Sequence, residues 1–342
     1  MRIQANYSLK DRNTFRIDIK AKYFVEIEKQ SDIITLRSDL KLASLPWIII
    51  GGASNLLFKK DLDKVVVSCR FKKIVQVKED DENVWLSVGA GLEWHELVKY
   101  TVDNSLWGLE NLAYIPGTVG AAPVQNIGAY DVEARDFITR VQTLNLFTGE
   151  RFEFKHADCQ FEYRNSVFKT QYENKLLVHR VTFRLKKMPF GHPNLTYAPL
   201  KKALANYKKK ELTPKIIFDA VIDIRQKKLP DPNIFGNAGS FFKNPMVSHD
   251  YLEELTKKFG EIPYHKMING EYKIPAAWLI EAAGWKGKKL TKTTGVSNQH
   301  ALFLVNYGGA TGKEINKLAN KIQEDIGHKF GIHLEREVIS IF

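Results

Sequence analysis

The sequence of 342 residues is poor in cysteine and contains no pair of cysteines with metal-ligand spacing. Its two cysteines, Cys69 and Cys159, lie far from each other in apolar or mixed stretches, which is typical of core thiols. No metal site is therefore expected. The low cysteine content favours a reducing compartment, so we expect a cytoplasmic protein.

Long apolar runs are absent as well. The first fifteen residues, MRIQANYSLKDRNTF, are polar and lack the apolar core of a signal peptide. Since no run of 18 apolar residues occurs, no segment is expected to span a membrane.

Long runs of one charge are also missing, although Lys and Arg (51) outnumber Asp and Glu (39), which gives a net charge of +12. The longest basic run is residues 208–210. A dispersed excess favours small anionic ligands over nucleic acid. A basic nucleic-acid-binding module is the alternative from a different class, but the sequence shows no helix-turn-helix, RNP-type strand or clustered basic face.

What is present is an ordinary globular composition, 44% hydrophobic and 26% charged, in a chain long enough for two or three domains. Periodicity predicts strands at residues 47–50, 65–69, 84–89, 140–146, 151–154, 175–185, 300–306 and 338–342. It predicts helices at residues 36–45, 91–102, 201–210, 248–260 and 275–283, together with helices that begin at Thr213-Pro214 and at a Thr311-x-x-Glu314 capping box.

Two glycine-rich segments lie between the predicted elements. Residues 51–55, Gly-Gly-Ala-Ser-Asn, directly follow a buried strand, where backbone N–H groups can face a phosphate; a plain tight turn is the alternative. They match neither the Rossmann nor the P-loop fingerprint. Residues 108–132 contain four glycines and favour main chain lying flat on a large ligand rather than a packed structural loop. His95, between the two segments, is interpreted as a surface or packing residue rather than a ligand.

The segment of residues 227–245, KKLPDPNIFGNAGSFFKNP, has no regular periodicity and is interpreted as the wall of a ligand pocket. Its polar residues surround one serine, Ser240; an ordered loop with a solvated serine is the alternative. A further candidate, Arg164, lies between Tyr163 and Asn165 and offers a guanidinium fork for a carboxylate.

In order along the chain, several motifs resemble the UDP-N-acetylenolpyruvoylglucosamine reductase (MurB) family. They are residues 13–15 (NTF), 52–55 (GASN), 108–112 (GLENL), 115–117 (IPG), 125–130 (QNIGAY), 163–164 (YR), 228–231 (KLPD), 236–245 (GNAGSFFKNP) and 334–337 (LExE). Tyr197 and the loop that carries Tyr264 resemble the type I subgroup.

The resemblance implies an α+β fold with a two-part FAD-binding region of the vanillyl-alcohol-oxidase type and a smaller α+β substrate-binding domain. The expected parts are residues 1–70, joined by a C-terminal strand at 332–342, residues 71–212, and the substrate-binding domain at 213–331. The implied reaction uses NADPH and FAD to reduce UDP-N-acetyl-3-O-(1-carboxyvinyl)-glucosamine to UDP-N-acetylmuramate for peptidoglycan synthesis. We expect a monomer that binds this UDP-sugar and NADPH, but neither nucleic acid nor membrane.

The matching motifs also imply roles for individual residues. Ser240 would donate the proton, and Arg164 and Glu337 would stabilise the intermediate. The substrate-binding residues would be Tyr197, Lys228, Asn244 and Tyr264. The FAD-binding residues would be Gly51, Gly52, Ala53, Ser54, Asn55, Leu56, Ile115, Pro116, Gly117, Gly120, Ala121, Gln125, Asn126, Ile127, Gly128 and Tyr130.

The chemistry places demands on three of these residues. Hydride transfer to the vinyl carbon leaves negative charge on the adjacent carbon and its carboxylate, which an arginine fork stabilises. Glu337 near that carboxylate is expected to be protonated at least part of the time. Ser240 is a weak acid, so Lys228 or Lys243 is expected to assist it. The nearest alternatives are another flavin oxidoreductase of the same superfamily and an inactive flavin-binding relative.

Overall fold

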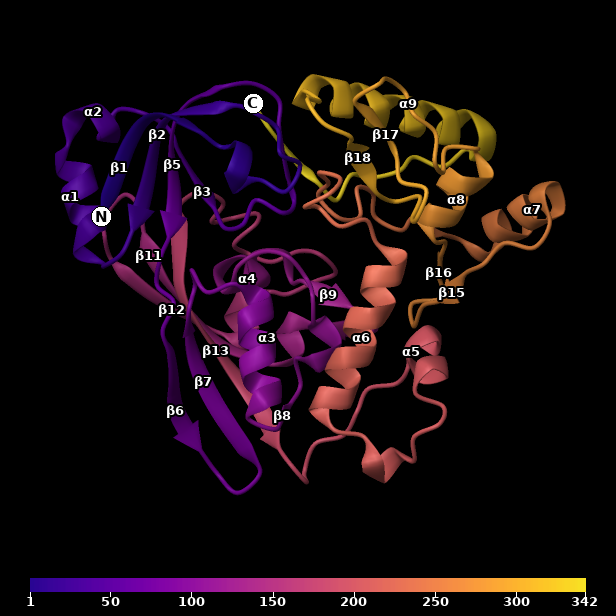
Figure 1. Ribbon diagram of the computed structural model, residues 1–342, viewed down its shortest axis with the longest axis horizontal. Coiled ribbons are helices and arrows are strands. Elements are labelled where there is room, and N and C mark those ends of the chain that lie inside the picture. The colour runs from indigo at the N-terminus through magenta and orange to yellow at the C-terminus, as the bar shows by residue number, and fades with distance from the viewer. The chain divides into compact units, whose positions relative to one another are not determined.

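The computed structural model describes residues 1–342 and has mixed α+β content (Figure 1). The chain divides into two compact units, each assembled from segments that are distant in the sequence. The first unit comprises Met1–Tyr7, Ala21–Gly52 and Leu62–Lys227, and the second comprises Ser8–Lys20, Ala53–Asp61 and Lys228–Phe342. The finer division into three parts, made from the sequence, stays a prediction.

The first unit contains a four-stranded sheet in the order β1-β2-β5-β3. Both β2 and β3 run parallel to the central strand β5, in which residues 65–67 are fully buried valines. Such a continuous β-branched run is typical of a parallel strand that is covered on both faces. The bounds are β1 Arg2–Ser8, β2 Lys20–Ile27, β3 Trp47–Ile50 and β5 Leu62–Cys69, with the helices α1 Ser31–Ser38 and α2 Leu40–Ala43.

A larger antiparallel sheet in the order β12-β11-β13-β7-β6 completes the framework of the first unit, with β8 paired to β13. The predicted apolar face of α3 is fully buried, and Trp94 on this helix meets Phe183 of β13 edge to face at 5.9 Å. The bounds are β6 Ile74–Glu79, β7 Asn83–Gly89, α3 Trp94–Asp103, β8 Leu106–Trp107, β11 Ile138–Asn145, β12 Arg151–Lys155 and β13 Leu176–Lys187.

Short elements join these sheets to one long helix, α6. As predicted, α6 begins at Pro214, and the Thr213 hydroxyl accepts a hydrogen bond from Ile216 N–H at 3.3 Å. The bounds are η2 Glu110–Leu112, η3 Val119–Ala121, α4 Ala122–Gln125, β9 Gly128–Ala129, β10 Val132–Glu133, η4 Ala134–Asp136, η5 His156–Cys159, α5 Ala198–Ala203, η6 Lys209–Glu211 and α6 Pro214–Lys228.

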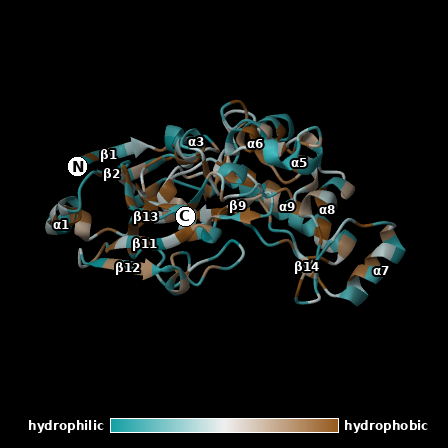
Figure 2. Cartoon of the chain, turned by 90° about the horizontal axis from the view of Figure 1, so that it is seen from below, coloured by the Kyte–Doolittle hydropathy of each residue, from teal (hydrophilic) through white to brown (hydrophobic).

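The second unit combines three amphipathic helices with short strand pairs. Its capped starts at Ser248 and Thr311 are confirmed, and Figure 2 shows hydrophilic and hydrophobic residues alternating along α7. The C-terminal strand β19 pairs parallel with β4. The bounds are η1 Lys10–Arg12, β4 Leu56–Phe58, β14 Met246–Val247, α7 His249–Phe259, β15 His265–Lys266, β16 Tyr272–Lys273, α8 Ala276–Ala282, β17 Thr294–Val296, β18 Leu304–Asn306, α9 Gly312–Phe330 and β19 Ile339–Ile341.

Three predicted elements differ from the structure. The helix expected at residues 36–45 is broken at Asp39, whose extended backbone ends α1 and whose carboxylate caps α2. The strand expected at residues 300–306 is reduced to β18, because His300 forms a turn in which its carbonyl accepts from Phe303 N–H at 3.1 Å. The helix expected at residues 201–210 is replaced by α5 and η6.

No helix of the structure is long and apolar enough to cross a membrane.

Glu110 is an ionisable residue buried in the first unit. Its carboxylate accepts a hydrogen bond from Gly108 N–H at 2.6 Å, and only 3% of the residue is exposed. Burial raises the pKa of Glu110 from 4.5 to about 7 because the charged form is poorly solvated. Between these two pH values the folded protein keeps a proton that the unfolded chain releases.

The stability of the protein should therefore decrease as pH rises from about 4.5 to 7. Glu110→Gln keeps an acceptor for Gly108 but cannot ionise, so it should raise the free energy of unfolding at pH 8 by up to about 3 kcal/mol. Urea denaturation at pH 5 and pH 8 measures the difference, with the exposed Glu173→Gln as control. Equal effects of Glu110→Gln at both pH values would contradict this prediction.

Candidate functional site

The two glycine-rich segments lie against each other in the first unit. A Cβ added to Gly51 would come within 2.5 Å of Thr118 Oγ1, and one added to Gly52 would come within 3.0 Å of Gly117 Cα. The contact explains why two glycines follow β3, since any side chain there would push the loops apart. The structure thus brings together two of the segments predicted to bind FAD.

Residues 108–132 fold as a series of short turns rather than as one open loop. Several residues in the segment have left-handed backbone conformations, including Gly117 (φ 119°), Asn126 (φ 44°) and Tyr130 (φ 54°). The segment is fastened to the start of α3, because Trp94 N–H donates to Gly117 O at 2.9 Å. Its four glycines are all half-exposed, so the segment presents backbone at these positions.

His95 is confirmed as a packing residue and also holds this segment. Its ring stacks on Phe218 of α6 at 5.3 Å, and its Nδ1 accepts a hydrogen bond from Tyr114 N–H at 3.0 Å. Accepting that bond requires a ring nitrogen without a proton. Burial, helped by Arg225, lowers the pKa of His95 and favours this neutral form.

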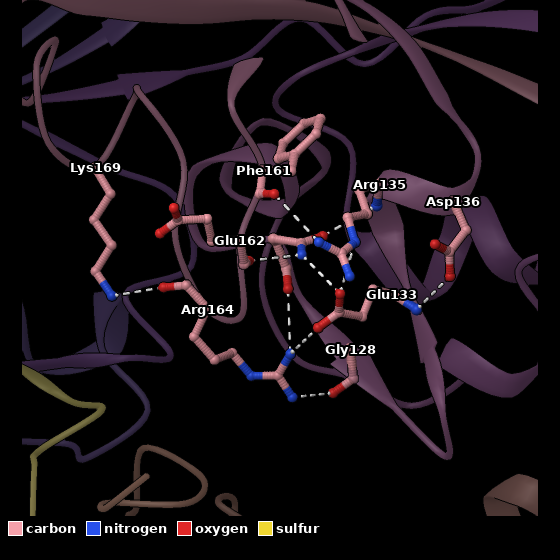
Figure 3. Close-up of polar contacts among 9 residues, drawn as sticks. Gly128, Glu133, Arg135, Asp136, Phe161, Glu162, Arg164 and Lys169 are labelled. Atoms are coloured by element: carbon pink, nitrogen blue, oxygen red, sulfur yellow. Dashed lines mark hydrogen bonds and ion pairs between the residues drawn. The ribbon is translucent and has the colours of Figure 1, made fainter. Parts of the chain in front are cut away.

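The predicted catalytic residue Arg164 binds the same glycine-rich segment (Figure 3). Its guanidinium donates to Asn126 O at 3.2 Å and to Gly128 O at 2.7 Å, and lies 3.6 Å from Glu133 Oε1. The residue has a left-handed backbone (φ 55°), and Lys169 Nζ donates to its carbonyl at 3.1 Å. Arg164 therefore holds main chain of the loop predicted to bind FAD.

Glu133 and Asn126 complete this polar cluster. Glu133 Oε2 accepts from Asn126 Nδ2 at 3.0 Å and pairs with Arg135 Nε at 2.9 Å (Figure 3). Asn126 Oδ1 in turn accepts from Arg135 N–H at 3.1 Å. The fully buried Asn126 side chain thus locks its own left-handed turn, and Glu133 and Arg135 belong to a site network that the sequence did not reveal.

A tyrosine pair lies beside a half-buried arginine in the first unit. The rings of Tyr130 and Tyr197 are 4.6 Å apart, and the Arg225 guanidinium lies 6.0 Å from the Tyr130 ring. Arg225 Nε is buried without a hydrogen-bond partner. Sequence reasoning did not select Arg225; the available signal was a cation next to the apolar residues Val221 and Ile224 on α6.

Ser240 lies in the second unit, in an irregular segment that main-chain hydrogen bonds hold in place. Phe241 N–H donates to Leu302 O at 2.9 Å, and Gly239 N–H donates to Asn237 Oδ1 at 3.0 Å. Gly239 adopts a left-handed conformation (φ 72°) immediately before Ser240. None of these bonds uses the hydroxyl of the half-buried Ser240, so this serine is not a backbone cap.

Gly236 serves the packing of the protein itself. A Cβ at this position would lie 2.3 Å from Phe15 O, so glycine is needed here for the close approach of the chain's own backbone. Asn306 also donates from Nδ2 to Phe15 O at 2.8 Å. The NTF motif at residues 13–15 therefore packs against Gly236, four residues before Ser240.

Glu337 lies next to this segment. Its backbone N–H donates to Phe241 O at 2.9 Å, and its carbonyl accepts from Asn55 Nδ2 at 3.0 Å. The side chain of Asn55, predicted to bind FAD, therefore also positions the backbone of Glu337. Within the second unit the structure brings Ser240 and Glu337 onto adjacent main-chain segments.

The remaining substrate-binding candidates of the second unit have different surroundings. Asn244 Oδ1 accepts from Ala276 N–H at 2.9 Å and so caps the start of α8. Tyr264 is 52% exposed, and its ring meets Tyr272 edge to face at 5.2 Å. Lys228 lies close enough to His300 to contribute, after burial, to lowering the pKa of that imidazole. Lys243 is paired with Glu335 at 2.6 Å.

The predicted site residues are thus shared between the two units. The first unit holds Gly51, Gly52, the candidates from Ile115 to Tyr130, Arg164 and Tyr197, and the second holds Ala53, Ser54, Asn55, Leu56, Lys228, Ser240, Asn244, Tyr264 and Glu337. No group of three or more His, Cys, Asp or Glu side chains is arranged to hold a metal ion.

The residues of the first unit fit a large flat dinucleotide such as FAD. Glycines allow the backbones of residues 51–52 and 117–118 to pack closely, and the half-exposed glycines of residues 108–132 can offer main-chain amide groups. The Tyr130–Tyr197 pair and Arg225 add aromatic surface and a cation for an anionic ligand.

Comparison with known protein families agrees with this site. Residues 21–155 match the FAD binding domain, and residues 231–341 match the C-terminal domain of UDP-N-acetylenolpyruvoylglucosamine reductase. These two matches confirm the α+β prediction of an FAD-binding region followed by a smaller C-terminal domain. They also support the predicted cofactors, FAD and NADPH.

Whole-chain relatives extend the comparison. The UDP-N-acetylenolpyruvoylglucosamine reductase of Amoebophilus asiaticus is 44% identical over 338 residues, covering 99% of both chains. That of Flavobacterium johnsoniae is 42% identical over 339 residues, with the same coverage. The crystal structure of the Thermus caldophilus reductase (MurB) shares the fold, with a TM-score of 0.70, 24% identity and 99% coverage of both chains.

The family expected from the sequence motifs is therefore confirmed, and with it an enzyme that uses FAD for an oxidoreduction in peptidoglycan precursor synthesis. From its glycine-rich FAD region to its C-terminal strand, the chain belongs to the UDP-N-acetylenolpyruvoylglucosamine reductase family.

Proposed function

We propose that the protein uses NADPH to reduce UDP-N-acetyl-3-O-(1-carboxyvinyl)-glucosamine to UDP-N-acetylmuramate. The observation that carries this proposal is the 44% identity to a named reductase over 99% of both chains. Residues 51–56 and 115–130 would hold FAD, which would supply the hydride chemistry between NADPH and the terminal carbon of the substrate's vinyl group. The residues of the chain would bind, orient and protonate the substrate.

Ser240 is the proposed proton donor. After hydride reaches the terminal carbon, the adjacent carbon needs one proton to complete the lactyl ether, and the Ser240 hydroxyl supplies it. The segment around Ser240 is fixed by main-chain bonds that leave the hydroxyl unused, which suits a group that must face a reacting carbon. Lys228 or Lys243 would supply the assisting positive charge.

Arg164 and Glu337 are the proposed stabilisers of the charge that develops before protonation. The Arg164 guanidinium stays protonated, and its two bonds to loop carbonyls fix its orientation in advance. Glu337 would contribute a hydrogen bond from a protonated carboxyl group, which disperses charge on the substrate carboxylate. Tyr197, Lys228, Asn244 and Tyr264 would bind the diphosphate and sugar.

The FAD-binding role of residues 51–56 and 115–130 is part of the same proposal. It is supported by the match of residues 21–155 to the FAD binding domain and by the contact of Gly52 with Gly117. Main-chain amides of these loops would face the diphosphate of the cofactor. A monomer in the cytoplasm is the simplest setting for this reaction.

The purified protein tests this function directly. It should be yellow. Under anaerobic conditions NADPH should remove the flavin absorbance, and the enolpyruvyl sugar nucleotide, added second, should restore it. NADH at the same concentration should bleach it more slowly. Restoration by another unsaturated acceptor but not by the enolpyruvyl sugar nucleotide would favour a different flavin oxidoreductase.

Ser240→Ala should slow the second half-reaction by about 10²- to 10⁴-fold, because it removes the proton donor. Reduction of the flavin by NADPH should remain within about twofold of the wild type. Stopped-flow absorbance measures the two steps separately. Ser248→Ala, which removes only the cap of α7, is the matched control. An equal loss in both half-reactions would contradict the role of Ser240.

Arg164→Met should weaken flavin binding as well as the second half-reaction. The change removes two charged hydrogen bonds to the carbonyls of Asn126 and Gly128, each contributing about 1.5–3 kcal/mol. We expect the dissociation constant for FAD to rise at least tenfold, measured by flavin fluorescence on reconstitution of the apoprotein. Arg140→Met, which removes an exposed ion pair with Glu153, should leave that constant unchanged.

A further inference from the structure

An arginine next to Glu337 is bound by a row of amide side chains on α9. The guanidinium of Arg336 donates from Nη1 to Asn316 Oδ1 at 2.8 Å, from Nε to Gln323 Oε1 at 3.0 Å, and from Nη2 to Asn320 Oδ1. The three amides are four and three residues apart, so they share one face of the helix.

The orientation of this amide row is fixed by a further bond. Gln323 Nε2 donates to Leu334 O at 2.7 Å, so its Oε1 is the atom available to Arg336. The partners of the guanidinium in these bonds are therefore neutral acceptors rather than carboxylates. Arg336 also lies 5.9 Å from the Phe241 ring, so one side chain contacts both α9 and the residue after Ser240.

The backbone of Arg336 is paired with the Ser240 segment. Arg336 and Phe242 form an antiparallel bridge, flanked by the bonds from Glu337 N–H to Phe241 O (2.9 Å) and from Lys243 N–H to Glu335 O (2.8 Å). In an extended segment, successive side chains point to opposite sides. With Arg336 directed to α9, the side chain of Glu337 is directed away from it.

Because side chains alternate, the register of residues 335–337 decides which of their side chains faces α9. A shift of one residue would turn Glu337 towards α9 and Arg336 away from it. The bridge is short, so its few main-chain bonds specify the register weakly. The three bonds from the Arg336 guanidinium to the amides are charge-assisted and therefore stronger than neutral hydrogen bonds, so they select one register over the other.

We propose that Arg336 is a positioning residue for Glu337. Through Asn316, Asn320 and Gln323 it fixes which side of residues 335–337 faces the Ser240 segment. This inference rests on the proposed function, in which Glu337 acts during the second half-reaction. Arg336 itself takes no part in proton or hydride transfer.

Arg336→Met in the full-length holoenzyme tests the inference. It keeps the apolar stem of the side chain but removes all donors, so the second half-reaction should slow at least tenfold. Flavin content and flavin reduction by NADPH should stay within twofold of the wild type, which also shows that the variant is folded. Lys321→Met, which removes one cation from the exposed side of the same helix, should change neither step.

A double-mutant cycle separates positioning from a general loss of structure. If Arg336 acts only through Glu337, adding Arg336→Met to Glu337→Leu, which has no side-chain donor, should cause no further loss beyond twofold. A further tenfold loss in the double variant would overturn this inference alone. A normal second half-reaction in Glu337→Leu, which has no side-chain donor, would overturn the proposed role of Glu337 and, with it, the inference.

Variants of the amide row provide a test that leaves the arginine in place. Asn316→Asp keeps an acceptor for Arg336 Nη1 and should retain the second half-reaction within twofold. Asn316→Leu removes the acceptor and should slow that step three- to tenfold. Equal rates in Asn316→Leu and the wild type, together with no effect of Arg336→Met, would show that the row does not position Glu337.

Discussion

Main-chain pairing between residues 241–243 and residues 335–337 is the constraint on which the site of the second unit depends. Ser240 lies in a segment without regular secondary structure, and its conformation is fixed by contacts with chain almost a hundred residues later. Each bond contributes only about 1 kcal/mol. Together with the buried rings of Phe241 and Phe242 they hold an irregular segment in one conformation.

In the first unit, side chains rather than main-chain pairing hold the loop that is predicted to bind FAD. Its glycine-rich loop has few regular bonds of its own, and side chains from elsewhere satisfy its main chain. Arg164 binds the carbonyls of Asn126 and Gly128, and His95 binds the amide of Tyr114. A loop with exposed backbone can face a dinucleotide only if something else maintains its shape, and these two side chains provide that support.

Arginines in the two units have different partners. Arg164 lies near Glu133 in a cluster of mixed charge, whereas the bonds from Arg336 reach neutral amides on α9. Arg225 has a buried Nε without a partner. Amide acceptors satisfy a guanidinium without cancelling its charge, so such arginines leave a net positive field for anionic ligands, in keeping with the charge of +12.

The sequence by itself determined the elements that depend on near neighbours, such as the Thr213-Pro214 start of α6 and the Thr311–Glu314 capping box of α9. It also identified the family, because its motifs are short and contiguous. The break at Asp39 escaped detection, since the apolar pattern continues through it.

Only the tertiary structure decided how distant residues meet. Arg336 lies inside the recognised motif at residues 334–337 and has no local signal of its role. The sequence alone would assign to the solvated side of an amphipathic helix the residues Asn316, Asn320 and Gln323. Only the packed structure shows that they bind Arg336. The same holds for Arg164, whose contacts lie 36 and 38 residues away. Sequence patterns report periodicity over a few residues, whereas these hydrogen bonds arise only when separate segments pack together.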